Sequence, residues 1–514
     1  MKFVSILNFV ILKKKMKKIN LLLIFSLTIT SLSFSQSKFG KNKVVTEPIG
    51  YSISGHIKNL ESTQDTLILA SYRATFEGTQ SFAIDTSLVI NNKILFKKIS
   101  TLDEGMYFIF DPQTGGMLLP LFITNQNFTF SFDIKDFDNT INFENSIDNT
   151  IATEYQSFIQ AKLQIRNKLS DKLDSLDNND RKIIESKISN INTSVKEYTN
   201  DFITKHSKTF FSKFLKANQQ IEIPESPLDS DGNPDKSFPY RYSKKHFWDN
   251  IDFTDSRILR TPIFFNKMDQ YLDKMTAKQP DSINVSADIL IELSKENKDI
   301  FQYVVSYITS TYERSKIMGM DAVFVHMVEK YYITNQCDWV DSTQLVKLQD
   351  RAQKIAPNLI GRKATEFIAY GTAFMKDTLG IPHTLSEIDS DYTVLVFYGP
   401  TCGHCKEEIP KIKHDVDSLI SSGYNIETFA VATEFDKKEW KEFINNQQTG
   451  DWINVSDINH DEEGNPVASS DWRDKYDIYS TPVIYLLDSD KKIIAKRISH
   501  SQIVEIIGRL GNNK

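Results

Sequence analysis

The chain has 514 residues, 40% of them hydrophobic, and a formal net charge of −6. Its length suggests about three domains, each able to build its own apolar core. The acidic balance argues against a protein that binds nucleic acid or anionic membranes. With only three cysteines, the fold must be stabilised by packing rather than by a disulfide framework.

The N-terminus has the pattern of a secretory signal peptide over residues 1–35. The basic run Lys13–Lys18 precedes an apolar stretch, 19–34, that is too short to predict a membrane-spanning helix. The best cleavage site follows Ser35, and Met16 is an alternative start. Removing residues 1–35 takes away six lysines and no acid, so the formal charge becomes −12. With no cysteine near the cleavage site, we expect a protein of the periplasm or cell envelope that carries no lipid anchor.

Residues 45–150 alternate apolar and polar positions at short intervals, with turn residues between them. This period of two predicts a β-sandwich of about seven strands. The clearest strand patterns are 51–57, 66–69, 93–96, 106–110 and 128–134. None of these segments has catalytic spacing, and their phenylalanines are expected to form a core.

Residues 151–355 carry apolar side chains at helical spacing, which predicts an all-α domain. The expected helices are 155–176, 180–205, 264–275, 287–295, 299–315, 320–333 and 342–355. The break at 224–242 contains Asp229–Asp235, where a solvated turn is favoured over a calcium loop because the glycine comes too early and no terminal Glu follows. Cys337 is expected to be a buried structural thiol, with regulation of the other two cysteines as the alternative.

The most informative motif is the C-x-x-C pair of Cys402 and Cys405. It follows an apolar strand, Thr393–Tyr398, and a break at Gly399–Thr401, and it opens a predicted helix. Backbone N–H groups at a helix N-terminus stabilise a thiolate, so Cys402 is predicted to be the attacking sulfur. Cys405, one turn into the helix, is predicted to be the buried resolving thiol.

Two other interpretations of the pair are a structural disulfide and half of a zinc site. Zinc would need two further Cys or His ligands at suitable spacing, and none lies nearby in the sequence, so no metal site is predicted. No cofactor is predicted either. His404, between the thiols, is expected to favour the thiolate electrostatically and to make the disulfide more oxidising.

A second element, Thr481-Pro482, precedes an apolar strand far downstream. From about residue 356 to the C-terminus the chain resembles the thioredoxin superfamily, and within it the TlpA-like and ResA-like envelope oxidoreductases. The resemblance rests on the C-x-x-C pair, on Glu408 and Pro410 after it, and on Thr481-Pro482 at the cis-proline position. It implies an α/β thioredoxin-like fold for 356–514, in which the Thr481-Pro482 loop packs against the thiols and pairs with the substrate backbone.

The domain differs from those relatives in two ways. Tyr398 and its neighbours stand where many relatives carry two tryptophans, so a stacking platform is weaker or differently built. Val396 occupies the position at which thioredoxin has a buried Asp, so that proton acceptor is missing. The ResA-like resemblance assigns proton transfer to Glu408, while a solvated carboxylate in the first helical turn is an equal alternative.

The remaining segments fit a doubly wound sheet. We expect a strand at 426–432, a helix at 436–446 capped by Asp436, a last antiparallel strand at 491–498 and a closing helix at 501–510. The polar stretch 457–470 is expected to be an exposed loop. Calcium binding by its carboxylates is an alternative, but their spacing does not match that of calcium ligands.

Two domains upstream also show a resemblance. Residues 45–150 resemble a small β-domain of unassigned function that precedes envelope thioredoxin domains in Gram-negative proteins, and His246–Phe253 resembles a segment of the helical domain between them. Neither resemblance implies a function.

Together these observations predict an exported thiol-disulfide oxidoreductase that exchanges disulfides with protein substrates, as a reductase or isomerase rather than a strong oxidase. The expected partners are protein thiols or disulfides and a membrane electron-transfer protein, and nucleic acid is not one of them. The rival hypothesis is an envelope scaffold protein with a vestigial redox domain. An intact cysteine pair with an intact Thr-Pro element disfavours it.

Overall fold

The computed structural model describes residues 50–60, 66–75, 78–173, 178–366, 375–434, 436–460, 463, 466–468 and 472–511. The predicted signal peptide lies outside these residues. The chain divides near residue 268 into two compact units, which are described separately.

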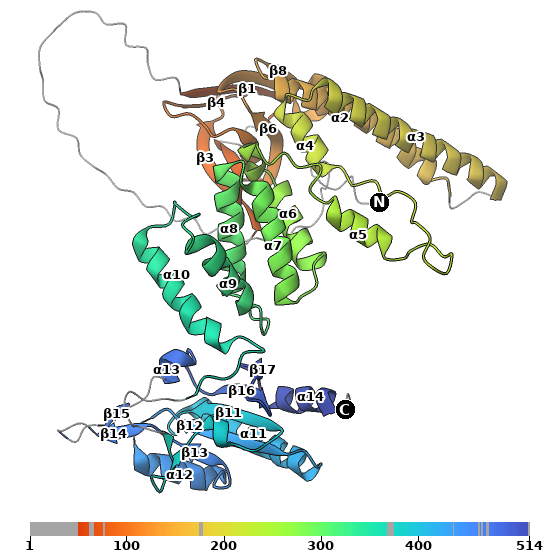
Figure 1. The fold of residues 1–514 in the computed structure, drawn as a ribbon. Helices are drawn as coiled ribbons and strands as arrows, with labels where there is room; N and C mark the ends of the chain where they lie inside the picture. Colours follow the sequence, from red (N-terminus) through yellow and green to blue (C-terminus); the bar gives the residue numbers. More distant parts are fainter. Residues whose placement is uncertain are drawn as a thin grey trace, which may run out of the picture. The chain divides into compact units, whose positions relative to one another are not determined.

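The first unit opens with a β-sandwich (Figure 1), as the alternating pattern predicts. One sheet has the order β4-β1-β7-β8, comprising Lys93–Lys98, Tyr51–Lys58, Asn127–Asp133 and Asn142–Glu144. The other has the order β3-β2-β5-β6, comprising Gly78–Leu88, Thr66–Thr75, Gly105–Asp111 and Gly116–Ile123. Apolar side chains from both sheets form one core, which includes Ile53, Leu69, Phe96 and Phe130. Strand β3 is mostly exposed, and for that reason its sequence lacks a clear apolar alternation.

A pair of long helices, α2 (Ile147–Ser170) and α3 (Asn178–Lys205), follows the sandwich and packs side by side (Figure 1). The rings of Phe158 and Tyr198 stack between them with centroids 3.7 Å apart. Helix α4 (Phe210–Asn218), which the helical pattern did not predict, packs its phenylalanines against Phe122 of β6. The helices are therefore anchored to the sandwich by aromatic contacts.

The predicted break at 224–242 is shorter than expected, because α5 (Phe238–Lys245) begins inside it with a proline in its first turn. Before this helix, Asp229 accepts hydrogen bonds from the backbone N–H groups of Asp231 and Asn233. The Asp229 carboxylate thus closes its own exposed turn, in agreement with the solvated-turn interpretation. A short 3₁₀ helix, Ser256–Arg260, and α6 (Ile263–Asp269) complete this part of the chain.

The second unit begins with a π-helical turn, Gln270–Lys274, followed by α7 (Pro280–Ser294), α8 (Lys298–Glu313), α9 (Asp321–Met327) and α10 (Ser342–Ile355). A π-helical turn, Val328–Tyr332, extends α9. Cys337 follows it, is buried, and donates to the Tyr331 carbonyl at 3.5 Å. Burial raises the pKa of its thiol to about 12, as expected for an inert structural cysteine.

The C-terminal part of this unit is built on a five-stranded sheet of order β13-β12-β11-β16-β17. The strands are Ile453–Val455, Ile426–Ala432, Tyr392–Tyr398, Val483–Asp488 and Ile493–Lys496. The first three are parallel, and β16 and β17 run antiparallel to their neighbours. The main flanking helices are α11 (Gly403–Ser421), α12 (Lys437–Gln447), α13 (Trp472–Lys475) and α14 (His500–Gly511).

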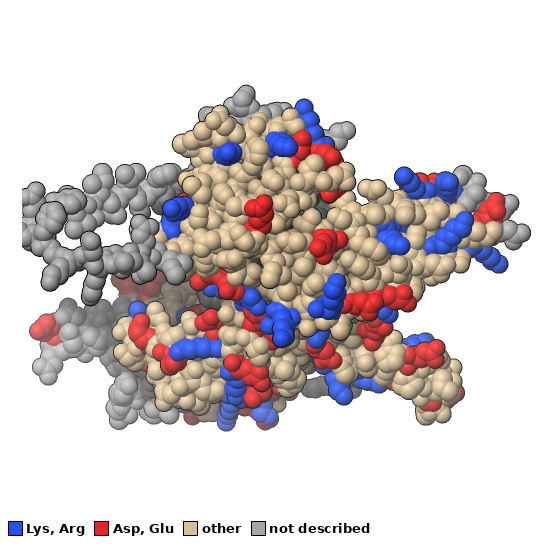
Figure 2. All heavy atoms as spheres, turned by 90° about the horizontal axis from the view of Figure 1, so that it is seen from above, with Lys and Arg blue, Asp and Glu red and all other residues tan. Residues whose placement is uncertain are grey.

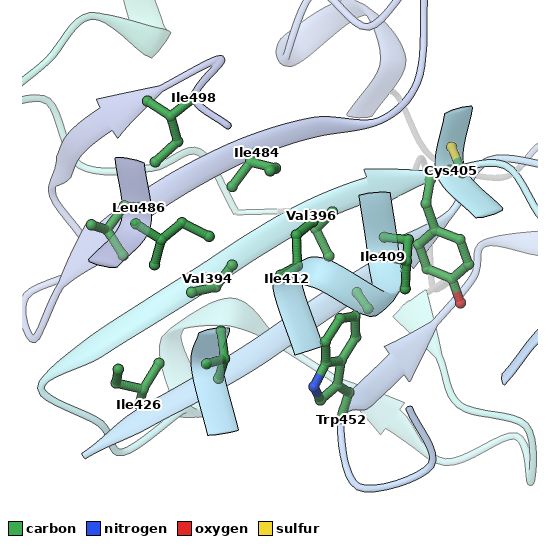
Figure 3. Close-up of a cluster of buried hydrophobic side chains, with 14 of the residues drawn as sticks. Val394, Val396, Cys405, Ile409, Ile412, Ile426, Trp452, Ile484, Leu486 and Ile498 are labelled. Carbon is green, nitrogen blue, oxygen red and sulfur yellow. The ribbon is translucent and has the colours of Figure 1, made fainter. Parts of the chain in front are cut away.

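Alternate residues of β11 point into two different cores. Val394 and Val396 pack with Ile409 and Ile412 of α11 (Figure 3), whereas Phe397 on the opposite face stacks against Trp472. The sheet is therefore covered on both faces, which explains why every residue of β11 is buried. This arrangement confirms the predicted α/β thioredoxin-like fold.

One sequence-based prediction in this domain was wrong. The stretch 457–470 was expected to be an exposed loop, yet β14 (Ile458–His460) and β15 (Pro466–Ala468) pair as an antiparallel hairpin and Asp457 is buried. Each of these strands has only three residues, which is too short for an apolar alternation to indicate it. Asp436, in contrast, caps α12 as predicted by accepting from the N–H groups of Lys438 and Glu439.

The helices and the redox domain of this unit are joined by a buried cation. The Lys496 ammonium is 6% exposed, donates to the Asn358 carbonyl at 2.7 Å and pairs with Asp321 at the start of α9. A buried charge without such partners would be costly. The helices and the redox domain of this unit are therefore connected by buried polar contacts in addition to the polypeptide chain.

Candidate redox site

The C-x-x-C pair lies where the central strand ends and α11 begins. Strand β11 ends at Tyr398, the turn Gly399–Thr401 reverses the chain, and Cys402 is the N-cap residue of α11. The Cys402 N–H donates to the Gly399 carbonyl at 3.1 Å, which closes the turn. The sequence-predicted order of strand, break and helix is therefore observed.

The Thr481-Pro482 element lies against the first thiol although it is remote in the sequence. Its peptide bond is cis, as the resemblance implies, and it leads into β16, the antiparallel neighbour of β11. Cys402 Sγ donates to the Thr481 carbonyl oxygen at 3.5 Å. The fold thus brings together Cys402, Cys405 and Thr481, three of the predicted site residues.

The environment of Cys402 favours its thiolate. Partial burial opposes ionisation, but hydrogen bonds from the Thr481 side chain and from the backbone N–H groups of Cys405 and His404 outweigh it. They hold the pKa of the Cys402 thiol below its ordinary value. The bond from Sγ to the Thr481 carbonyl favours the protonated form, but a long bond from a weak thiol donor has little influence.

The environment of Cys405, in contrast, favours its protonated thiol. Its side chain is 0% exposed, and burial raises its pKa to about 12, although the Gly399 N–H donates to its sulfur at 3.4 Å. Figure 3 shows its sulfur at the edge of the apolar cluster between α11 and β11. One thiol is therefore accessible and acidic, while the other is enclosed and protonated. Neither forms a disulfide in this structure.

The structure places the side chains of His404 and Glu408 outside this group of contacts. The His404 side chain is exposed, and its backbone N–H rather than its ring is directed to Cys402. The Glu408 carboxylate pairs with Lys411 at 2.7 Å. Among the described residues Glu408 has no hydrogen bond to either thiol. No direct contact therefore supports proton transfer by Glu408, and this role stays a prediction.

Sequence reasoning missed two features around the pair. The buried Tyr398 hydroxyl accepts from Trp440 Nε1 at 2.9 Å and donates to Asn454 Oδ1 at 3.2 Å. Glu434, just after β12, bonds to Thr401. A signal for Glu434 existed, because parallel β11 and β12 bring their carboxyl ends to the same edge of the sheet.

In the described part of the chain, no group of three or more His, Cys, Asp or Glu side chains could hold a metal ion. None of the helices there has the length and apolarity needed to cross a bilayer.

The asymmetry between the thiols predicts a pH profile for alkylation. Only a thiolate is nucleophilic, so the reaction of Cys402 with iodoacetamide should rise with pH and level off above its pKa. We expect the midpoint to fall below about 8.5, the value of a free cysteine. Cys405 should stay unmodified throughout that range. Mass spectrometry of the two cysteines in the Cys402→Ser and Cys405→Ser variants separates the profiles; equal midpoints would contradict the asymmetry.

Comparison with known proteins agrees with this geometry. Residues 360–496 match the AhpC/TSA family, residues 51–152 match a domain of unknown function, DUF4369, and residues 174–358 match another, DUF5106. No curated protein matches the chain.

Three solved structures illustrate the similarity. A thioredoxin-like protein from Bacteroides caccae is 18% identical over 56% of this chain and 98% of its own, with a TM-score of 0.40. A domain of possible thiol-disulfide isomerase from Cytophaga hutchinsonii is 33% identical over 30% of this chain and 95% of its own, with a TM-score of 0.25. A thiol-disulfide oxidoreductase from Bacteroides fragilis is 18% identical over 29% of this chain and 99% of its own, with a TM-score of 0.24.

The strand order, the C-x-x-C turn and the matched family define the C-terminal domain as thioredoxin-like. It is an AhpC/TSA-family domain, preceded by a DUF4369 and a DUF5106 domain. The fold of this domain is that of thiol-disulfide oxidoreductases.

Proposed function

We propose that this protein is an exported thiol-disulfide oxidoreductase of the TlpA-like or ResA-like kind, acting on disulfides of other proteins. The observation that carries the proposal is the asymmetry of the pair: Cys402 is partly exposed with a lowered pKa, while Cys405 is enclosed with a raised one. A vestigial site would have no need for hydrogen bonds from two separate chain segments that favour a thiolate.

The chemistry follows in two exchanges. The Cys402 thiolate attacks one sulfur of a substrate disulfide, the substrate S–S bond breaks, and the departing sulfur leaves as a thiolate that takes a proton. Cys405 then loses its proton and attacks Cys402 Sγ, which releases the second substrate thiol. The substrate gains two electrons and two protons, and the protein loses them as its two thiols become the Cys402–Cys405 disulfide.

The structure suggests why Cys405 reacts second. The charge on Cys402 is among the causes that raise the pKa of Cys405. That charge disappears when Cys402 enters the mixed disulfide, so deprotonation of Cys405 becomes easier at the moment when it is required. Thr481 and Pro482, beside Cys402, are proposed to pair with the substrate backbone.

The location and partners are part of the proposal. The basic and apolar pattern of residues 13–34 supports export to the periplasm or envelope, and an oxidised pair there needs an electron donor, proposed to be a membrane protein. On the face shown in Figure 2, the described Lys and Arg side chains are interspersed with Asp and Glu. A mixed surface of this kind supports protein substrates over nucleic acid.

Trapping tests the proposal. The Cys405→Ala variant, expressed in its native host, should accumulate mixed disulfides with exported proteins on Cys402, because the resolving thiol is missing. Mass spectrometry after non-reducing purification identifies them. A variant that also carries Cys402→Ser is the matched control and should trap nothing. If both variants recover the same proteins, the proposed exchange is wrong.

A further inference from the structure

Glu434 reaches from the neighbouring strand to the turn that carries Cys402. It lies just beyond β12, is partly buried, and accepts two hydrogen bonds from Thr401. The Thr401 N–H donates to Oε2 at 2.8 Å and the Thr401 hydroxyl to Oε1 at 2.8 Å. The Glu434 carboxylate thus accepts hydrogen bonds from both the backbone N–H and the hydroxyl of Thr401, the residue immediately before Cys402.

Gly399 shows how closely the carboxylate approaches the site. A Cβ on Gly399 would lie 2.4 Å from Glu434 Oε1 and 3.3 Å from the Cβ of Cys402. Glu434 Oε1 and Cys402 Cβ are therefore no further apart than the sum of these two distances. The absence of a side chain at Gly399 leaves the room that the carboxylate occupies.

Among the residues that the structure describes, no Lys, Arg or His forms an ion pair with the Glu434 carboxylate, and Arg473 of α13 donates to the carbonyl of the neighbouring Thr433. The groups in contact with the Cys402 thiol include the buried Cys405 and the backbone N–H of the exposed His404, both on α11, and the hydroxyl and carbonyl of Thr481. An unpaired carboxylate this close disfavours a second negative charge.

We propose that Glu434 is a positioning residue of the redox pair: it fixes the Cys402 turn through Thr401, and its charge limits how much thiolate Cys402 forms. The inference rests on the proposed function. The N–H groups at the start of α11 favour the Cys402 thiolate, and the Glu434 charge disfavours it. The reactivity of Cys402 is then set by the balance of these two effects.

Two variants of the full chain separate the charge from the hydrogen bonds. Glu434→Gln keeps the shape and can bond to Thr401 through its amide oxygen and nitrogen, but it removes the charge. Thr401→Val keeps the charge and removes the hydroxyl bond. The measurements are the midpoint of Cys402 alkylation against pH and the equilibrium with a glutathione buffer, with Cys402 followed by mass spectrometry.

Glu434→Gln should lower the alkylation midpoint by about half a unit to one unit, and at pH 6 should speed alkylation roughly three- to tenfold. It should also shift the glutathione equilibrium toward the reduced protein. Thr401→Val should leave the midpoint near that of the wild type. An unchanged midpoint in Glu434→Gln, with or without a loss of stability, would reduce Glu434 to a structural residue and overturn the inference.

The failure of this inference can be told apart from a failure of the proposed function. Alkylation needs no substrate, whereas reduction of insulin disulfides by the wild-type chain tests the function directly. A wild type that does not reduce insulin refutes the function, and an active wild type with an unshifted Glu434→Gln midpoint refutes only the role of Glu434.

Discussion

The Cys402→Ser variant should lose nearly all insulin reduction, whereas Cys405→Ser should lose turnover but still form mixed disulfides. A serine hydroxyl is not ionised near neutral pH and cannot replace the thiolate, so the loss should be at least about a hundredfold. Cys405 cannot substitute for Cys402, because it is fully enclosed and its pKa is raised to about 12. The rate is followed by the precipitation of reduced insulin chains with a chemical reductant supplying electrons.

Cys337→Ser is the matched control for these variants. Cys337 is also buried with a raised pKa, and it lies in the helical segment before the redox domain. It should retain wild-type turnover if its role is structural. Equal and mild losses from Cys402→Ser and Cys405→Ser would contradict the assigned order of attack, and a loss in Cys337→Ser without loss of folding would support the regulatory alternative.

Most of the C-terminal fold could be predicted, because its local signals agree with its tertiary structure. The apolar run of β11 indicates a strand buried on both faces, and the capping of α12 by Asp436 follows from a short polar side chain before a helical pattern. The C-x-x-C motif combined strand, turn and helix in one short segment. The thiol-disulfide chemistry of the motif could therefore be predicted from local sequence alone.

The features that were missed depend on contacts between distant segments. Glu434 lies 33 residues after Thr401 along the chain, so only the parallel pairing of β11 and β12 brings the two together. Strand β3 lacks apolar periodicity because it is mostly exposed, and β14 and β15 have three residues each, too few for an alternation to appear. Helix α2 begins at Ile147, well before the predicted start, where Asp148 and Asn149 are buried and bonded to distant backbone N–H groups. Polar residues in such positions conceal a helix from periodicity analysis.

The redox potential of the Cys402–Cys405 pair should lie between those of thioredoxin, about −270 mV, and protein disulfide isomerase, about −180 mV. The N–H groups that stabilise the Cys402 thiolate favour the reduced form and raise the potential above that of an ordinary dithiol. The His404 imidazole adds little, because it is exposed and its charge is screened by water. Enclosure of Cys405 restricts the reduced pair to a single negative charge.

Equilibration of the full chain with glutathione buffers of graded ratio measures this potential, with the disulfide quantified by mass spectrometry so that Cys337 does not interfere. His404→Ala is the matched variant, and its potential should fall by no more than about 30 mV, which corresponds to about 1.4 kcal/mol for a two-electron couple. A wild-type value near −120 mV, the potential of DsbA, would mean that the protein oxidises its substrates. The proposed direction as reductase or isomerase would then be wrong, even though the order of attack by Cys402 and Cys405 would still hold.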